Sequence, residues 1–151
     1  MNENQTILLV DDSENDILLA RIAFAAAGIT NPLQEAHNGD EAVAYLRGES
    51  PFKNRHKFPL PAIMLLDLNM PMRNGFEVLE WVRAQPGLKR LTVIILTASL
   101  REEDVDRAFD LAANAFMVKP SSIEGLTDTA RCLHKWMGCL HFPKLKAVVG
   151  K

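Results

Sequence analysis

Polar side chains that could do chemistry together follow four of the most apolar segments of the chain. Asp11 and Asp12 follow one aliphatic run, Asp67 follows a second, Thr97 ends a third, and Lys119 ends a fourth. Three carboxylates brought together would repel one another and need a cation, and oxygen ligands of this kind suit Mg²⁺. A carboxylate can accept a phosphoryl group covalently, and a metal ion, an ammonium group and a hydroxyl would neutralise the transferred charge. The pattern therefore predicts phosphoryl transfer to Asp67.

The segments that position these residues alternate between strand-like and helix-like patterns. We expect strands at 7–10, 33–37, 63–66, 92–96 and 115–118, and helices at 15–27, 40–47, 76–84, 102–113 and 122–137. Five alternations predict an α/β fold with a doubly wound, five-stranded parallel sheet and five helices. Ligands of such sheets bind at the carboxyl ends of the strands. Since the polar residues all lie at strand ends, we expect them to converge there.

The order and spacing of these residues along 5–137 resemble the receiver domain of two-component response regulators. The resemblance rests on Asp11-Asp12, Asp67 in LLDLNMP, Gly75, Thr97-Ala98 and Lys119-Pro120. No single match is specific to this family, but the full set is specific, because each match lies at the end of its own strand. The resemblance implies a flavodoxin-like receiver fold and a protein that signals but is not an enzyme beyond its own phosphorylation and dephosphorylation.

The resemblance also assigns a role to individual residues around the metal. Asp67 would be the phosphoacceptor, and Mg²⁺ would be held by Asp11, Asp12, Asp67 and the backbone carbonyl of Asn69. No other cofactor is implied.

Further roles concern the phosphoryl group and the response to it. Thr97, Ala98 and Lys119 would contact the phosphoryl group, and the bond between Lys119 and Pro120 would be cis. Phe116 stands at the position of the aromatic switch residue, without the hydroxyl of the tyrosine often found there.

Composition narrows the choice of partners. The chain has 151 residues, a net charge of -2 and a pI of about 6.1, which argues against a general nucleic-acid or membrane-surface binder. Neither a signal peptide nor an apolar window of about 20 residues is evident, so we expect a cytoplasmic protein.

The partner implied by the resemblance is a sensor histidine kinase or a phosphotransfer protein. The long insert at 48–61 and the apolar tail resemble the small stand-alone, single-domain regulators related to those paired with bacterial phytochromes, which makes a phytochrome kinase a candidate.

Other functions fit the residues less well. A phosphatase of the haloacid dehalogenase type needs a second aspartate two residues after Asp67, where this chain has Asn69. A nucleotide-binding module would need a glycine-rich phosphate-binding loop after the first strand, and this sequence has none there. A zinc site would need Cys132, His134, Cys139 and His141 to converge, but residues two apart on a helix point in nearly opposite directions.

The segment after the last expected helix is unusually apolar for a chain end. We expect residues 138–151 to form an interface segment, with Trp136, Leu140 and Phe142 as contact residues. The tail could cover its own domain or reach a second copy. The sequence favours a homodimer, because dimer contacts would give phosphorylation something to modulate.

Overall fold

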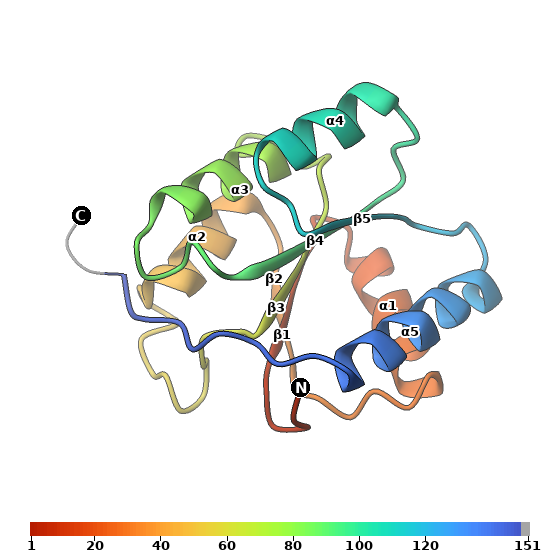
Figure 1. Cartoon of the computed structure of the whole chain (residues 1–151), viewed down its shortest axis with the longest axis horizontal. Coiled ribbons are helices and arrows are strands. Elements are labelled where there is room, and N and C mark those ends of the chain that lie inside the picture. The colour runs from red at the N-terminus through yellow and green to blue at the C-terminus, as the bar shows by residue number, and fades with distance from the viewer. Residues whose placement is uncertain (149–151) are drawn as a thin grey trace.

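Residues 1–148 of the computed structural model are described here. One parallel sheet forms the centre of the molecule, with the strand order β2-β1-β3-β4-β5 (Figure 1). The strands are β1 (Ile7–Val10), β2 (Leu33–Ala36), β3 (Ile63–Leu66), β4 (Thr92–Thr97) and β5 (Ala115–Val118). Their aliphatic composition fits burial on both faces, since β1 and β3 are buried at every position. The prediction of a five-stranded parallel sheet is confirmed.

Helices cover both faces of the sheet. They are α1 (Glu14–Ala26), α2 (Gly39–Arg47), α3 (Gly75–Ala84), α4 (Glu102–Asp110) and α5 (Ile123–Gly138). Figure 1 shows α1 and α5 on one side of the sheet and α2, α3 and α4 on the other. Each side has its own apolar cluster, which alternating strand residues share with the helices above them. None of the helices among residues 1–148 is long and apolar enough to cross a membrane.

Local signals fix where several helices begin. The side chains of Ser13, Asn38 and Asn74 each accept a hydrogen bond from a backbone N–H of the first turn of α1, α2 and α3. At α3, Glu77 completes a capping box. These caps start the helices at the carboxyl ends of the preceding strands, where the polar residues lie.

The fourth helix is shorter than predicted. It ends at Asp110 rather than at Ala113, because Ala112 adopts a left-handed conformation with φ of 67°. The N–H of Ala113 then bonds back to the carbonyl oxygen of Ala108 at 2.9 Å, as in a common helix-terminating turn.

The insert between α2 and β3 is folded against α2. Tyr45 forms an aromatic cluster with Phe52 and Phe58, with ring centroids 5.1 and 6.0 Å away. The Arg55 guanidinium donates to the carbonyl oxygens of Tyr45, Leu46 and Phe58 at 2.7–3.1 Å. Because the last carbonyls of a helix lack partners within it, Arg55 closes the end of α2.

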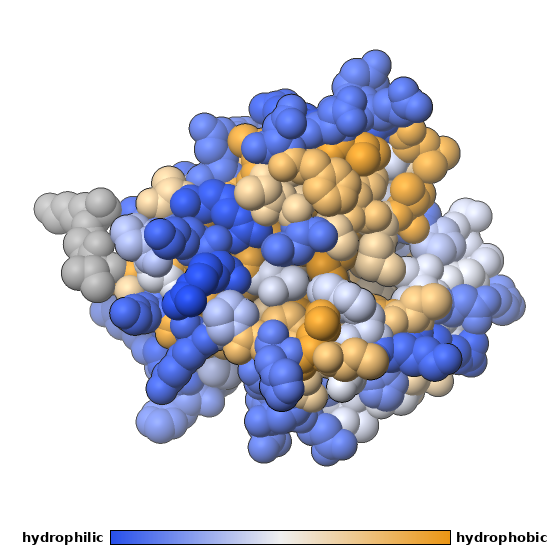
Figure 2. All heavy atoms as spheres, in the orientation of Figure 1, coloured by the Kyte–Doolittle hydropathy of each residue, from blue (hydrophilic) through white to orange (hydrophobic). Residues whose placement is uncertain are grey.

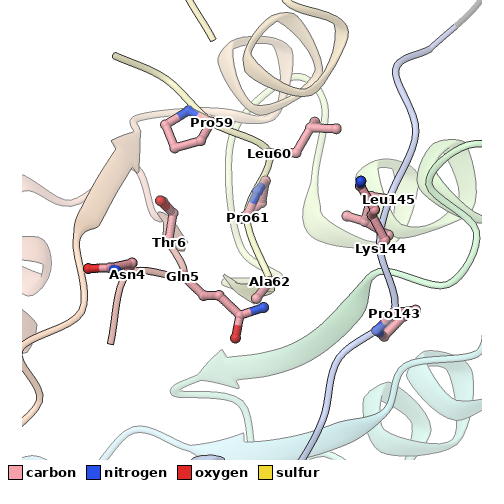
Figure 3. A pocket seen from close by; sticks show the side chains of 10 residues that line it. All are labelled: Asn4, Gln5, Thr6, Pro59, Leu60, Pro61, Ala62, Pro143, Lys144 and Leu145. Carbon is pink, nitrogen blue, oxygen red and sulfur yellow. The ribbon is translucent and has the colours of Figure 1, made fainter. Parts of the chain in front are cut away.

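The tail passes the amino ends of the strands (Figure 1). The Lys146 N–H donates to the carbonyl oxygen of Gly87 at 3.0 Å, and Leu145 and Val148 pack against the apolar cluster of α2, α3 and α4. A pocket of about 290 Å³ separates part of the tail from the start of β1 and the end of the insert (Figure 3). Within this chain the tail therefore lies on its own domain, while the last three residues fall outside the described part.

Candidate functional site

The polar residues predicted to converge do meet at the carboxyl ends of the central strands. Val10 pairs with Leu66, and Leu66 with Ile95, so the ends of β1, β3 and β4 lie side by side. One carboxylate oxygen from each of Asp11, Asp12 and Asp67 lies within 4.8 Å of the other two.

Burial differs among these groups. Asp11 is 3% exposed, Asp67 7% and Thr97 0%, whereas Asp12 is exposed. A buried carboxylate is costly unless a positive charge or hydrogen-bond donors face it. The exposed Asp12 marks the side from which solvent, and with it a cation, reaches the cluster.

Lys119 supplies a positive charge to the cluster. Its Nζ donates to Asp11 Oδ2 at 2.5 Å and to Asp67 Oδ2 at 3.3 Å. Burial alone would lower the pKa of Lys119, but the hydrogen bond to Asp11 and the charges of Asp67 and Asp11 outweigh it and raise this pKa. Burial raises the pKa of Asp11, although Lys119 and the Ser13 N–H oppose that rise. Lys119 is therefore held as an ammonium ion beside the Asp67 oxygens.

The loop after β3 is folded tightly around Asp67. The Asn69 N–H donates to Asp67 Oδ1 at 3.3 Å, and the Asn69 side chain lies 3.4 Å from Thr97 Oγ1. A Cβ on Gly75 would lie 2.3 Å from the backbone oxygen of Asp67. Only glycine fits there, which gives a physical reason for the glycine that the sequence pattern singled out.

Two further predicted residues lie near the end of β4 and on β5. Ala98 is exposed and directly follows the buried Thr97. Phe116 is half-buried and packs against the apolar cluster of α2, α3 and α4. Beside that cluster, Arg107 of α4 lies over the ring of Phe76 at 4.2 Å.

The prediction of a cis bond between Lys119 and Pro120 is wrong. The cis peptide among residues 1–148 is Ser50–Pro51, so the Lys119–Pro120 bond is trans. Trans is the lower-energy form of most bonds to proline, and Lys119 reaches both Asp11 and Asp67 with it.

Sequence reasoning missed one residue of this site, Asp16. Its Oδ2 accepts a hydrogen bond from Lys119 Nζ at 3.0 Å. A weak signal was present: Asp16 lies in the first turn of α1, which begins directly after Asp11 and Asp12 at the carboxyl end of β1.

The predicted interface residues are placed around the end of α5. Trp136 is 38% exposed, and its ring packs edge-on against Phe142 with centroids 6.4 Å apart. Leu140 is half-buried. The sulfhydryl groups of Cys132 and Cys139 are free and exposed.

The donor set fits a magnesium ion. Asp11, Asp12 and Asp67 offer carboxylate oxygens and form the group within residues 1–148 that could hold a metal. Hard oxygen donors with room for water are what Mg²⁺ prefers, since it keeps part of its hydration shell in most protein sites.

Comparison with known proteins agrees with this geometry. Residues 7–131 match the response regulator receiver domain. The chain is 34% identical over 125 residues to response regulator Rcp1 of Synechocystis sp., covering 83% of each chain.

Solved structures are similar as well. A phosphorylated cyanobacterial phytochrome response regulator, RcpA, superimposes with a TM-score of 0.85 at 32% identity, over 93% of this chain and 99% of that one. The response regulator RPA3017, in red light signaling of R. palustris, superimposes with a TM-score of 0.87 at 33% identity, over 93% of this chain and 99% of that one. A structure of Rcp1 has been solved in a Mn²⁺-bound form. The chain belongs to the response regulator receiver domain family.

Proposed function

We propose that this response regulator accepts a phosphoryl group on Asp67 from a histidine kinase or a phosphotransfer protein, in a reaction that depends on Mg²⁺. The observation that carries the proposal is the position of Asp67, which is buried between two other carboxylates and the ammonium group of Lys119. An Asp67 oxygen attacks phosphorus while the bond from phosphorus to the donor breaks. The protein mainly positions and neutralises charge in such a transfer.

The roles of the surrounding residues follow from their positions. Asp11, Asp12, Asp67 and the carbonyl of Asn69 would hold Mg²⁺, which would offset the charge of the phosphoryl oxygens. The Thr97 hydroxyl and Lys119 donate hydrogen bonds to these oxygens.

We assign Ala98 to the space around the phosphoryl group and Phe116 to the response to phosphorylation. Ala98 leaves room for the phosphoryl group because its side chain is a single methyl group. Phe116 is the candidate switch, since it is half-buried beside α4 and could change its packing when the loop after β4 moves.

Incubation with acetyl phosphate and Mg²⁺ tests the phosphoacceptor. We expect one phosphoryl group, mapped to Asp67 by mass spectrometry after proteolysis, and none on Asp67→Asn. Labelling of Asp67→Asn to the wild-type level would refute the assignment. Rapid turnover of many phosphoesters by the wild type would instead support a phosphatase.

The kinase is proposed to belong to the phytochrome class. Support comes from the resemblance to RcpA, which is named as a phytochrome response regulator, and to RPA3017, which is named in red light signaling. Phosphotransfer from a purified phytochrome histidine kinase should be faster than from a histidine kinase that responds to another signal. Equal phosphotransfer rates from the two kinases would argue against a phytochrome kinase as the partner.

We propose that residues 5–137 form the receiver domain, and that the segment 138–151 contributes to a homodimer. In Figure 2, apolar side chains gather between α4 and α5, over the edge strand β5. Trp136 belongs to this side of α5 and lines an apolar groove with Met117 and Leu133. The output of the protein would then pass through protein–protein contacts.

Sedimentation tests the dimer. The full chain should form dimers at micromolar concentration, whereas a chain truncated after Met137 should be a monomer that still accepts a phosphoryl group. A full chain that remains monomeric with and without phosphorylation would leave the tail as a cover of its own domain.

A further inference from the structure

Lys119 has a third acidic partner outside the metal cluster. Its Nζ lies 2.5 Å from Asp11, 3.0 Å from Asp16 and 3.3 Å from Asp67. Asp16 is thus a nearer acceptor for this ammonium group than the phosphoacceptor is. Any movement of Lys119 toward a phosphoryl group on Asp67 has to loosen the contact with Asp16.

The position of Asp16 is fixed by the start of α1. Its backbone N–H donates to the Ser13 hydroxyl at 3.2 Å, which holds the first turn of α1, and from this turn the Asp16 carboxylate reaches Lys119. A small cavity beside this contact is lined by Asp16, Lys119 and apolar side chains that include Leu19 and Leu126. The Lys119 side chain is 15% exposed and that of Asp16 40%, so these apolar groups shield the ion pair only in part, and it interacts more strongly than a fully exposed pair would.

Asp16 does not belong to the carboxylates that could hold the metal ion, which are Asp11, Asp12 and Asp67. Its contact with the site is the ion pair with Lys119. We propose that Asp16 is a positioning residue that retains Lys119 on the α1 side of the site and so restrains its movement to the phosphoryl group.

The restraint follows from how charge is redistributed on phosphorylation. One Asp67 oxygen becomes part of the bond to phosphorus, while new anionic oxygens appear farther from β3. Lys119 has to follow that charge, and the fixed carboxylate of Asp16 competes for it. Removing the Asp16 charge should favour the phosphorylated arrangement.

Beryllofluoride, a stable mimic of the phosphoryl group on aspartate, provides the test. In the presence of Mg²⁺, Asp16→Asn should bind beryllofluoride about three- to fivefold more tightly than the wild type, which is the scale of a partly exposed ion pair. Asparagine keeps the size of the side chain and leaves the Ser13 cap intact, so the fold should be retained.

Glu14→Gln is the matched control. Glu14 is exposed, lies in the same first turn of α1 and has the same charge. Equal tightening by both variants would show a general field effect and overturn the proposal, as would unchanged or weaker binding by Asp16→Asn.

A spectroscopic readout separates positioning from a merely structural role. The ¹⁵N signal of the Lys119 ammonium group should shift in Asp16→Asn without phosphoryl mimic and stay in place in Glu14→Gln. No shift in Asp16→Asn would overturn the proposal. The inference rests on the proposed role of Lys119, and failure of the wild type itself to bind beryllofluoride would count against that function as a whole.

Discussion

The two ends of the central sheet use polar groups in opposite ways. At the carboxyl end, Asp11 and Asp67 are buried beside each other with Lys119 between them. At the amino end, the Arg55 guanidinium donates to carbonyl oxygens at the end of α2. The guanidinium of Arg83, on α3, donates to the carbonyl oxygen of Leu91, just before β4. The first arrangement concentrates like charges, and the second supplies unpaired carbonyls with donors.

The difference separates function from stability. Repulsion among carboxylates leaves the carboxyl end ready to bind a cation and a phosphoryl group, at some cost to the folded state. The amino end carries the insert, the aromatic cluster around Tyr45 and the tail, all of which bury or pair polar backbone. Changes at the carboxyl end should alter chemistry, and changes at the amino end should alter stability alone.

Gly75→Ala should have the largest effect and should damage both properties. A Cβ there would meet the Asp67 backbone oxygen at 2.3 Å and Leu68 Cα at 2.8 Å, so the loop must shift. We expect a loss of about 3 kcal/mol in the free energy of unfolding together with a loss of phosphorylation, measured by urea denaturation and acetyl phosphate labelling.

Gly87→Ala and Gly138→Ala are the controls for that prediction. A Cβ at Gly87 meets only tail oxygens, those of Lys146 and Ala147, within 3.0 Å, and one at Gly138 meets nothing within 4 Å. Both variants should label normally. Impaired labelling of Gly87→Ala would contradict the separation of the two ends.

Arg55→Ala should come next and affect stability only. Arg55 donates to three carbonyl oxygens, of which that of Tyr45 keeps a second donor in the Gly48 N–H; losing these bonds should cost roughly 2–3 kcal/mol in the free energy of unfolding. The exposed Lys53→Ala, two residues earlier, should leave stability unchanged. Phosphorylation of both variants should match the wild type, and a slower rate in Arg55→Ala would link the insert to the site.

Asp12→Ala should affect metal binding without lowering stability. Mutation of even an outer-shell partner of a metal ligand costs about 10- to 100-fold in affinity, so removing the Asp12 carboxylate, which would itself hold Mg²⁺, should weaken Mg²⁺ binding by at least about 10-fold. The metal-free protein should be as stable as the wild type or slightly more so, since one of three neighbouring negative charges is gone. Calorimetric titration with Mg²⁺ and urea denaturation measure the two effects, and an unchanged affinity would exclude Asp12 as a ligand.

Tyr45→Phe should have the smallest effect at neutral pH. The Tyr45 hydroxyl donates to the Pro59 carbonyl oxygen at 2.8 Å, a bond worth about 1 kcal/mol to the free energy of unfolding. Burial raises the pKa of Tyr45 from 10.0 to about 12, against the opposing charge of Arg55.

The raised pKa sets the sign of the pH dependence of this variant. The unfolded state loses its Tyr45 proton first, so the contribution is complete below pH 10.0 and is lost as the pH rises toward about 12. Wild type should therefore lose stability more steeply than Tyr45→Phe across that range in urea denaturation. Parallel curves of stability against pH for the two proteins would show that Tyr45 does not cause the loss of stability at high pH.

The sequence by itself determined the order of elements and grouped most of the residues that meet at the carboxyl ends of the strands. Aliphatic runs such as Ile63–Leu66 are buried on both faces of a parallel sheet, and this pattern is readable without a structure. Because parallel strands present their carboxyl ends at one edge, Asp11, Asp67 and Lys119 could be grouped from their places in the chain.

Tertiary structure decided what depends on distance between segments. Asp16 joined the site only because α1 and the end of β5 meet, and Arg55 became a cap only because the insert folds over α2. The path of the tail beside Gly87 likewise depends on packing. Periodicity reports which face of an element is buried, but it does not report which distant side chain that face will meet.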